Sequence, residues 1–367
     1  MRKHYIDNIR SLTVILVVCY HIVYLFNGIV QDGVIGSLTD WHGMDVVMYL
    51  LYPWFMVILF LVSGMSSRYY LEGHTAQEYC KARTRKLLVP STIGILVFGW
   101  AQGYFNMAIS GAFAQMPGQI PKGILYLIMC VSGIGVLWTI QVMWVCSMVL
   151  LLCRKIEKGR LLCWGEKAEI GVLLLLGIVV WGAAQIGNTP IIPVYRFGIY
   201  TFTFLLGYYV FSYEKVTDLL AGYALPLVGA AGVLGVLYCV SAYGTNYAVM
   251  PYVGSPLAIA YGWIACLAVL GCMKRFGNRT GKVWQFLHRK SFGLYVFHYL
   301  SLSACAYCLT TKTSLPAGII YLLSALAAFG GGFLLYEIFS RIPVVRWCVL
   351  GIKKEKKHVS GKSDFTS

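Results

Sequence analysis

The stretch 46-VVMYLLYPWFMVILFLVSGMS-66 decides the fold, because it has no charged side chain along its whole length. A helix rises about 1.5 Å per residue, so a run of this length crosses the roughly 30 Å hydrocarbon layer of a bilayer. Similar runs recur along the chain, and helices satisfy their own backbone groups in lipid. The sequence therefore predicts an all-α fold, a polytopic transmembrane helical bundle of about ten helices. The predicted spans are 11–28, 46–66, 87–107, 132–153, 168–187, 197–213, 222–242, 255–273, 291–310 and 317–340.

The composition indicates that the bilayer is the main surrounding of the chain. Hydrophobic residues make up 59% of it and charged residues 12%, with a mean hydropathy of +0.71, far from the averages of soluble domains. A net charge of +16 could suggest a nucleic-acid partner. The Lys and Arg residues stand between the apolar runs instead, which is typical of membrane topology, so no nucleic acid is expected.

The distribution of Lys and Arg predicts the orientation. Of the 30 such residues, 27 fall on the side that holds both termini. Since basic loops stay in the cytoplasm, the N and C termini are expected there, in a multi-pass protein of the plasma membrane. The basic segments are 67–86, 154–167 and 274–290, and the cation-poor ones are 29–45, 108–131, 188–196, 243–254 and 311–316.

The chain is expected to be one transmembrane domain over 1–352, followed by a disordered basic cytoplasmic tail over 353–367. The stretch 121–153 is long enough for one helix and a re-entrant segment, which is left open. The 12 cysteines are scattered through apolar runs without metal-ligand spacing, so no metal is expected.

Few ionisable side chains lie within the predicted spans. Apart from Tyr and Cys, and away from the first and last two residues of each span, they are His21, His298 and Glu337. Arg10 and His21 share a helix face because their separation is close to three turns of about 3.6 residues, and Asp7 precedes Arg10 by about one turn. A charged group at this depth costs about 2.5–3.5 kcal/mol, so each needs an explanation. The structural alternatives are hydrogen bonds between helices for the histidines, a positive-inside anchor for Arg10 and an interfacial ion pair for Glu337.

Five short motifs follow one another along the chain. They are Ile6-Asp7-Asn8-Ile9-Arg10 running on to Tyr20-His21, Leu59-Phe60-Leu61-Val62-Ser63-Gly64, Arg83-Thr84-Arg85-Lys86, Leu137-Trp138-Thr139-Ile140-Gln141 and Phe297-His298. In this order they resemble membrane acyltransferase family 3 over nearly the whole chain. The closing segment 341–351 is similar to the glucan-modifying, polysaccharide O-acetyltransferase subgroup. Lys86 stands where the family has a second Arg. A Lys ammonium is a point charge, whereas an Arg guanidinium can donate two parallel hydrogen bonds to one phosphate.

The resemblance implies an O-acyltransferase that moves an acetyl or succinyl group from cytoplasmic acyl-coenzyme A to a hydroxyl of an extracytoplasmic or lipid-linked carbohydrate. Acetyl is the commoner donor group of the family. A homodimer or a separate glycan-assembly partner is left open.

The resemblance also implies roles for the ionisable residues. His21 is expected to be the general base, with Arg10 orienting the donor and Asp7 supporting Arg10. Arg83, Arg85 and Lys86 are expected to contact the coenzyme A phosphates, with positive-inside anchoring of the loop as the structural alternative. His298 and Glu337 are further catalytic candidates.

Two alternatives remain at this point. Transfer could be direct or could pass through an acyl-histidine. The chain could also be a proton-coupled transporter or exporter of a glycan or small molecule, in which His21, His298 and Glu337 relay protons.

Overall fold

The computed structural model describes residues 3–30, 33–40, 42–118, 120–157, 159–189 and 192–352. Within these ranges the chain is helical and has no strand, apart from one isolated bridge between Asn188 and Arg196. The predicted all-α fold is confirmed. The predicted tail, 353–367, lies outside the described residues.

Seven helical stretches of the described chain are long and apolar enough to cross a membrane. Each matches one predicted span, and the helical membrane fold is therefore confirmed. They are α1 (His4–Leu25), α2 with α3 (Val46–Leu51 and Phe55–Leu71), α7 (Trp138–Glu157), α12 (Ala224–Ala242), α13 (Pro256–Arg275), α14 (Lys282–Lys312), and α15 with α16 (Ala317–Leu326 and Gly332–Arg341).

The other three predicted spans coincide with shorter helices, so the count of ten stays a prediction. They are α5 (Trp100–Ile109), which continues from α4 (Ala76–Arg83) through π-helical turns, α9 (Ile170–Ala184) and α10 (Phe197–Tyr209). The stretch 121–153 forms α6 (Lys122–Ser132) and then most of α7. With 11 residues, α6 is about 16 Å long and shorter than the hydrocarbon layer.

Two helices begin earlier than predicted. α1 starts at His4 rather than at 11, and α14 starts at Lys282 rather than at 291. Their first turns carry polar side chains that pair with each other outside the apolar region. Asn8 Nδ2 donates to the carbonyl oxygens of Gly277 and Arg279 at 2.7 and 2.9 Å, and Asn8 Oδ1 lies 2.7 Å from His288 Nε2. Hydropathy alone cannot place such a boundary, because these turns are helical without being apolar.

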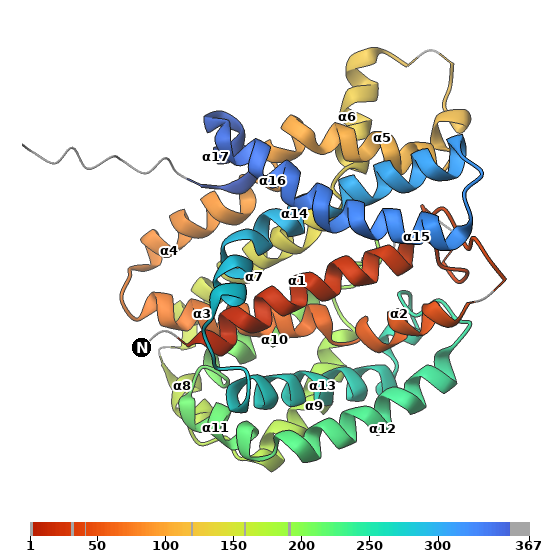
Figure 1. Cartoon of the computed structure of the whole chain (residues 1–367). Helices are drawn as coiled ribbons and strands as arrows, with labels where there is room; N and C mark the ends of the chain where they lie inside the picture. The colour runs from red at the N-terminus through yellow and green to blue at the C-terminus, as the bar shows by residue number, and fades with distance from the viewer. Residues whose placement is uncertain are drawn as a thin grey trace, which may run out of the picture.

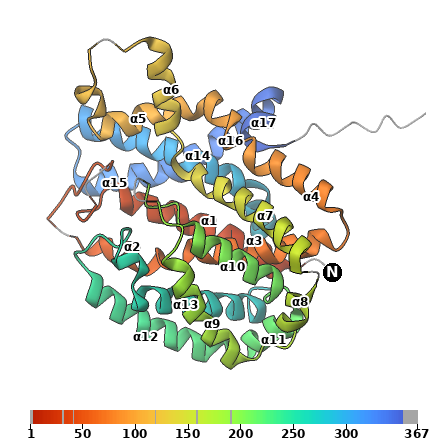
Figure 2. The same ribbon diagram turned by 180° about the vertical axis from the view of Figure 1, so that it is seen from behind.

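The helix α1 lies near the middle of the bundle in both views (Figures 1 and 2) and packs against α3, α13 and α14. The helices α3 and α10 approach most closely where two glycines meet the opposite backbone. A Cβ on Gly64 would lie 1.9 Å from the carbonyl oxygen of Phe204, and one on Gly207 would lie 2.0 Å from that of Leu61. The Ser63-Gly64 motif therefore has a packing role, since only glycine permits this crossing.

The two ends of the bundle differ in charge. In Figure 1 the N-terminus, α4, α8 (Arg160–Gly165) and α11 (Glu214–Gly222) lie toward the left end, which carries the basic segments. The connections between α12 and α13 and between α14 and α15 lie toward the right, cation-poor end. At the basic end Lys274 Nζ lies 3.1 Å from Glu214 Oε1, and its hydrogen bond lowers the pKa of Glu214.

Candidate active site

Two of the predicted residues, His21 on α1 and His298 on α14, meet inside the bundle. Nε2 of His298 lies 3.1 Å from Nδ1 of His21, and the ring centroids are 5.1 Å apart. His298 is fully buried, whereas His21 is only partly covered. The sequence identified both residues separately, and the packing of α1 on α14 makes them a pair.

The neighbours of the pair determine where a neutral imidazole carries its hydrogen. Nδ1 of His298 lies 3.1 and 2.8 Å from the carbonyl oxygens of Leu294 and Tyr295, which can only accept, so this nitrogen carries the hydrogen. Nε2 of His298 is then an acceptor. Nδ1 of His21 faces that acceptor and the carbonyl oxygen of Val17, 2.8 Å away, so it must donate. This leaves Nε2 of His21 with a free lone pair.

His21 lies on the wall of a cavity of about 690 Å³. Loop residues of the cation-poor end also line it, among them Gly33, Pro193 and Asn246, so the cavity lies toward that end. None of the described residues on its wall is Asp, Glu, Lys or Arg. Nine of its 28 lining residues are Tyr, Trp or Phe, and these are Tyr20, Tyr24, Tyr52, Phe55, Trp138, Tyr195, Tyr200, Tyr295 and Tyr299. Aromatic faces with hydroxyl tips suit a polar but uncharged ligand with apolar C–H surfaces.

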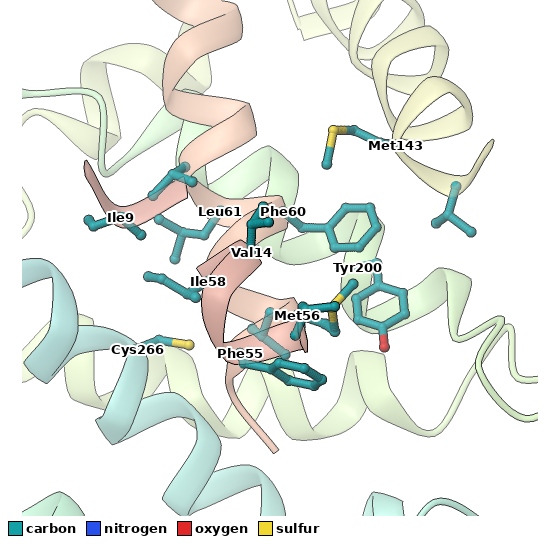
Figure 3. Close-up of a cluster of buried hydrophobic side chains, with 14 of the residues drawn as sticks. Ile9, Val14, Phe55, Met56, Ile58, Phe60, Leu61, Met143, Tyr200 and Cys266 are labelled. Atoms are coloured by element: carbon teal, nitrogen blue, oxygen red, sulfur yellow. The ribbon is translucent and has the colours of Figure 1, made fainter. Parts of the chain in front are cut away.

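Buried apolar side chains separate the cavity from the basic end. Val14 lies between Arg10 and the cavity-lining Val17 on α1. Phe60 on α3 and Met143 on α7 are buried as well, and all three side chains are at most 7% exposed. Figure 3 shows Val14, Phe60 and Met143 in one buried cluster. None of these three side chains lines the cavity.

The predicted donor-site residues gather at the basic end of the bundle. We call the cluster of Arg10, Arg83, Arg85 and Lys86 the basic mouth. Arg83 Nη2 donates to Ser67 Oγ at 2.7 Å, and the guanidinium lies 5.0 Å from the ring centroid of Tyr79. The Arg85 Nε atom is buried without a hydrogen-bond partner. In the part of the chain that is described, Arg83, Arg85 and Lys86 form no ion pair.

Charge accumulates in the basic mouth. Burial, followed by the positive charges of Arg85, Arg83 and Arg10, lowers the pKa of Lys86. Asp7 supplies a carboxylate beside this group, and its Oδ1 lies 3.6 Å from Nη1 of Arg10, as the helix spacing predicted. A cluster with this excess of positive charge favours an anionic ligand such as a phosphate group.

The structure does not bring Glu337 to the histidines. It pairs with Lys290 of α14, and its side chain is 43% exposed. Within the described residues no hydrogen bond or ion pair joins it to His21 or His298. Glu337 therefore forms an interfacial ion pair, which was the structural alternative considered for it, and its partner is Lys290.

Sequence analysis missed several residues of the site. Tyr299 follows His298 directly, and its ring centroid lies 4.9 Å from that of His21, so the Phe297-His298 motif was one residue too short. Tyr20, which the first motif includes without a role, contacts His21 edge-on at 5.3 Å. Arg196 was counted only as one of the few outer cations, although it is 3% exposed.

Comparison with known proteins gives one match. A family model described as an acyltransferase domain matches residues 3–337. No curated protein and no solved structure matches the chain. In the described residues no group of three or more His, Cys, Asp or Glu side chains could hold a metal ion.

Proposed function

The chain belongs to acyltransferase family 3 and is a membrane acyltransferase, and from this premise we propose that it moves an acetyl or succinyl group from cytoplasmic acyl-coenzyme A to a carbohydrate hydroxyl. The acceptor would occupy the aromatic cavity and the coenzyme A phosphates the basic mouth. The protein would lie in the plasma membrane with the basic end in the cytoplasm.

The histidine pair is the main support for this proposal. A hydroxyl is a weak nucleophile until a base takes its proton during attack. Nε2 of His21 has the lone pair that such a base needs, and His21 is on the wall of the cavity. His298 would keep the hydrogen of His21 on Nδ1, and so act as a positioning residue.

The reaction would proceed in two steps. The acceptor oxygen bonds to the thioester carbon while its proton passes to Nε2 of His21. The tetrahedral intermediate then breaks its C–S bond, and the coenzyme A thiolate takes up the proton from His21. In the acyl-histidine alternative the same nitrogen attacks the thioester first, and the labelled acyl group would remain on the protein when no acceptor is present.

The separation between the basic mouth and His21 suits a long, thin donor. Arg10 and His21 are about 16 Å apart along α1 at 1.5 Å per residue. The donor arm would have to displace the buried layer that includes Val14, Phe60 and Met143. Methionine is flexible enough to make such a passage.

A proton-coupled exporter is less well supported. A relay would require Glu337 near the histidines, whereas it pairs with Lys290 at the surface of the bundle. The cavity wall also lacks any carboxylate among the described residues.

Inverted membrane vesicles from cells that produce the protein provide the test, because they expose the cytoplasmic face and retain native glycans. Radiolabelled acetyl- and succinyl-coenzyme A are supplied, and label in the carbohydrate fraction is measured. We expect His21→Ala to lower transfer by about 10²-fold or more, the usual contribution of a general base. His74→Ala is the matched control, since His74 lies on an exposed loop. Transfer that survives His21→Ala would contradict the role of His21, and absence of donor-dependent labelling by the native protein would contradict the proposed activity.

A further inference from the structure

Arg196 is a buried cation that the proposed reaction does not yet use. It precedes α10, is 3% exposed, and donates from Nη2 to the carbonyl oxygen of Val253 at 3.1 Å. Its Nε atom is buried without a hydrogen-bond partner. Within the described ranges no carboxylate pairs with it. A buried charge without a counter-ion is costly, and in a membrane protein such a residue usually has a function.

Three tyrosines surround the guanidinium, and two of them separate it from the cavity. The charge of the guanidinium acts on Tyr200, Tyr52 and Tyr238, which therefore lie near it. Tyr52 and Tyr200 are on the cavity wall, whereas Arg196 and Tyr238 are not. Arg196 therefore stands behind the wall and would act on a bound molecule through Tyr52 and Tyr200.

These two hydroxyls are available to a ligand. The Tyr52 hydroxyl is buried without a hydrogen-bond partner. Tyr200 lies near a guanidinium, which has no lone pair and cannot accept the hydrogen of the Tyr200 hydroxyl, so this hydrogen can point to a ligand instead. A hydroxyl that accepts from a cation becomes a stronger donor.

Tyr52 and His21 both line the cavity and both contact Tyr20. The ring centroid of Tyr20 lies 6.0 Å from that of Tyr52 and 5.3 Å from that of His21. The Tyr20 hydroxyl is occupied by Tyr247, 2.9 Å away. One ring thus separates His21 from Tyr52 on the cavity wall, so a single bound molecule can contact the base and a hydroxyl donor.

We propose that Tyr52 and Tyr200 donate hydrogen bonds to the oxyanion of the tetrahedral intermediate, and that Arg196 is the positioning residue that orients and polarises them. This rests on the proposed acyl transfer. When the acceptor oxygen attacks, an electron pair of the thioester C=O bond moves onto the carbonyl oxygen, and it returns when the C–S bond breaks. Fixed donors in a site without bulk water stabilise that transient charge most effectively.

The test compares Tyr52→Phe, Tyr200→Phe and Arg196→Met with Tyr238→Phe in the vesicle assay with acetyl-coenzyme A. Tyr238 is the matched control, because it faces the same guanidinium but lies off the cavity wall. We expect each of Tyr52→Phe and Tyr200→Phe to lower kcat by about 10²-fold, the usual effect of losing one oxyanion donor, with little change in donor KM. Tyr238→Phe should retain the native kcat.

A double-mutant comparison separates positioning from a purely structural role. Arg196→Met should lower kcat in the native protein but cause no further loss in the Tyr52→Phe/Tyr200→Phe background. Arg196→Lys, which keeps the charge, should restore part of the loss. Equal losses in both backgrounds, or native kcat in both tyrosine variants, would overturn the inference while leaving the acyl transfer intact. If Arg196→Met does not fold, the kcat values of the three tyrosine variants still test whether Tyr52 and Tyr200 donate to the oxyanion. An inactive native protein would overturn the proposed function itself.

Discussion

Nδ1 of His21 and Nε2 of His298 lie 3.1 Å apart, although 277 positions separate the two residues in the chain. Two backbone carbonyls fix the hydrogen on His298, and Nε2 of His298 together with the Val17 carbonyl fixes the hydrogen on His21. The nitrogen of His21 that remains free belongs to a residue of the cavity wall. The positions of both hydrogens follow because a carbonyl oxygen can only accept a hydrogen bond.

Substitution of His298 should show whether its acceptor nitrogen matters. We expect His298→Phe to lower kcat by between about tenfold and 10²-fold. A general base that is misplaced by about 1 Å lowers the reaction rate by a factor of this size. His298→Gln should retain more activity, since the amide oxygen of Gln can still accept from His21. Donor KM should change little in either variant. Equal activity of the Gln and Phe variants would show that hydrogen-bond acceptance by residue 298 is unimportant.

The individual members of this site could be predicted, but their arrangement could not. His21 and His298 are identifiable because a titratable group in an apolar run is costly. Their pairing depends on how α1 packs against α14, and Asn8 anchors that contact through residues outside the apolar runs. The ion-pair partner of Glu337 could not be predicted either, because Lys290 belongs to the helical extension of α14 that precedes the predicted span.

For the fold, too, the individual helices could be predicted from the sequence, but their arrangement could not. Hydropathy located the seven long apolar stretches, since length and composition alone define them. It could not reveal the cavity, whose wall includes loop residues such as Gly33, Pro193 and Asn246 that follow no helical period. Arg196 was visible in the sequence, but its burial depends on the contact with Val253, which is far along the chain.

Donor binding should depend on pH through Lys86. The protonated side chain attracts phosphate, and its pKa is lowered, so it loses its charge at a lower pH than an ordinary lysine does. Affinity for acyl-coenzyme A should therefore fall as pH rises through this lowered pKa, below the ordinary value of about 10.4. Lys86→Arg should keep its affinity to higher pH, because a guanidinium stays protonated. Calorimetric titration with a non-hydrolysable acetyl-coenzyme A analogue measures both profiles, and identical profiles would exclude Lys86 from the donor site.

Gly64 should be essential for the packing of α3 on α10. In Gly64→Ala the new methyl group would lie 1.9 Å from the Phe204 carbonyl oxygen, so the two helices must separate. We expect a loss of about 1–3 kcal/mol in the free energy of unfolding, the usual cost of overpacking. Gly229→Ala is the control, because nothing lies within 4 Å of its added Cβ. Thermal unfolding in detergent, followed by tryptophan fluorescence, measures both, and native stability of Gly64→Ala would contradict the close crossing.

The direction in which the donor approaches depends on the orientation of the bundle, which native Cys163 can report. It is exposed and belongs to α8, within the basic segment 154–167. Because basic loops stay in the cytoplasm, a membrane-impermeant maleimide should label Cys163 in inverted vesicles and not in intact cells. A cysteine introduced as Ser37→Cys, in the exposed loop after α1, should show the opposite pattern, and Cys163→Ser gives the background from the other cysteines. The reverse labelling would place the basic mouth outside the cell. The cytoplasmic donor would then have to enter through the aromatic cavity, which has no basic side chain among its described wall residues to hold its phosphates.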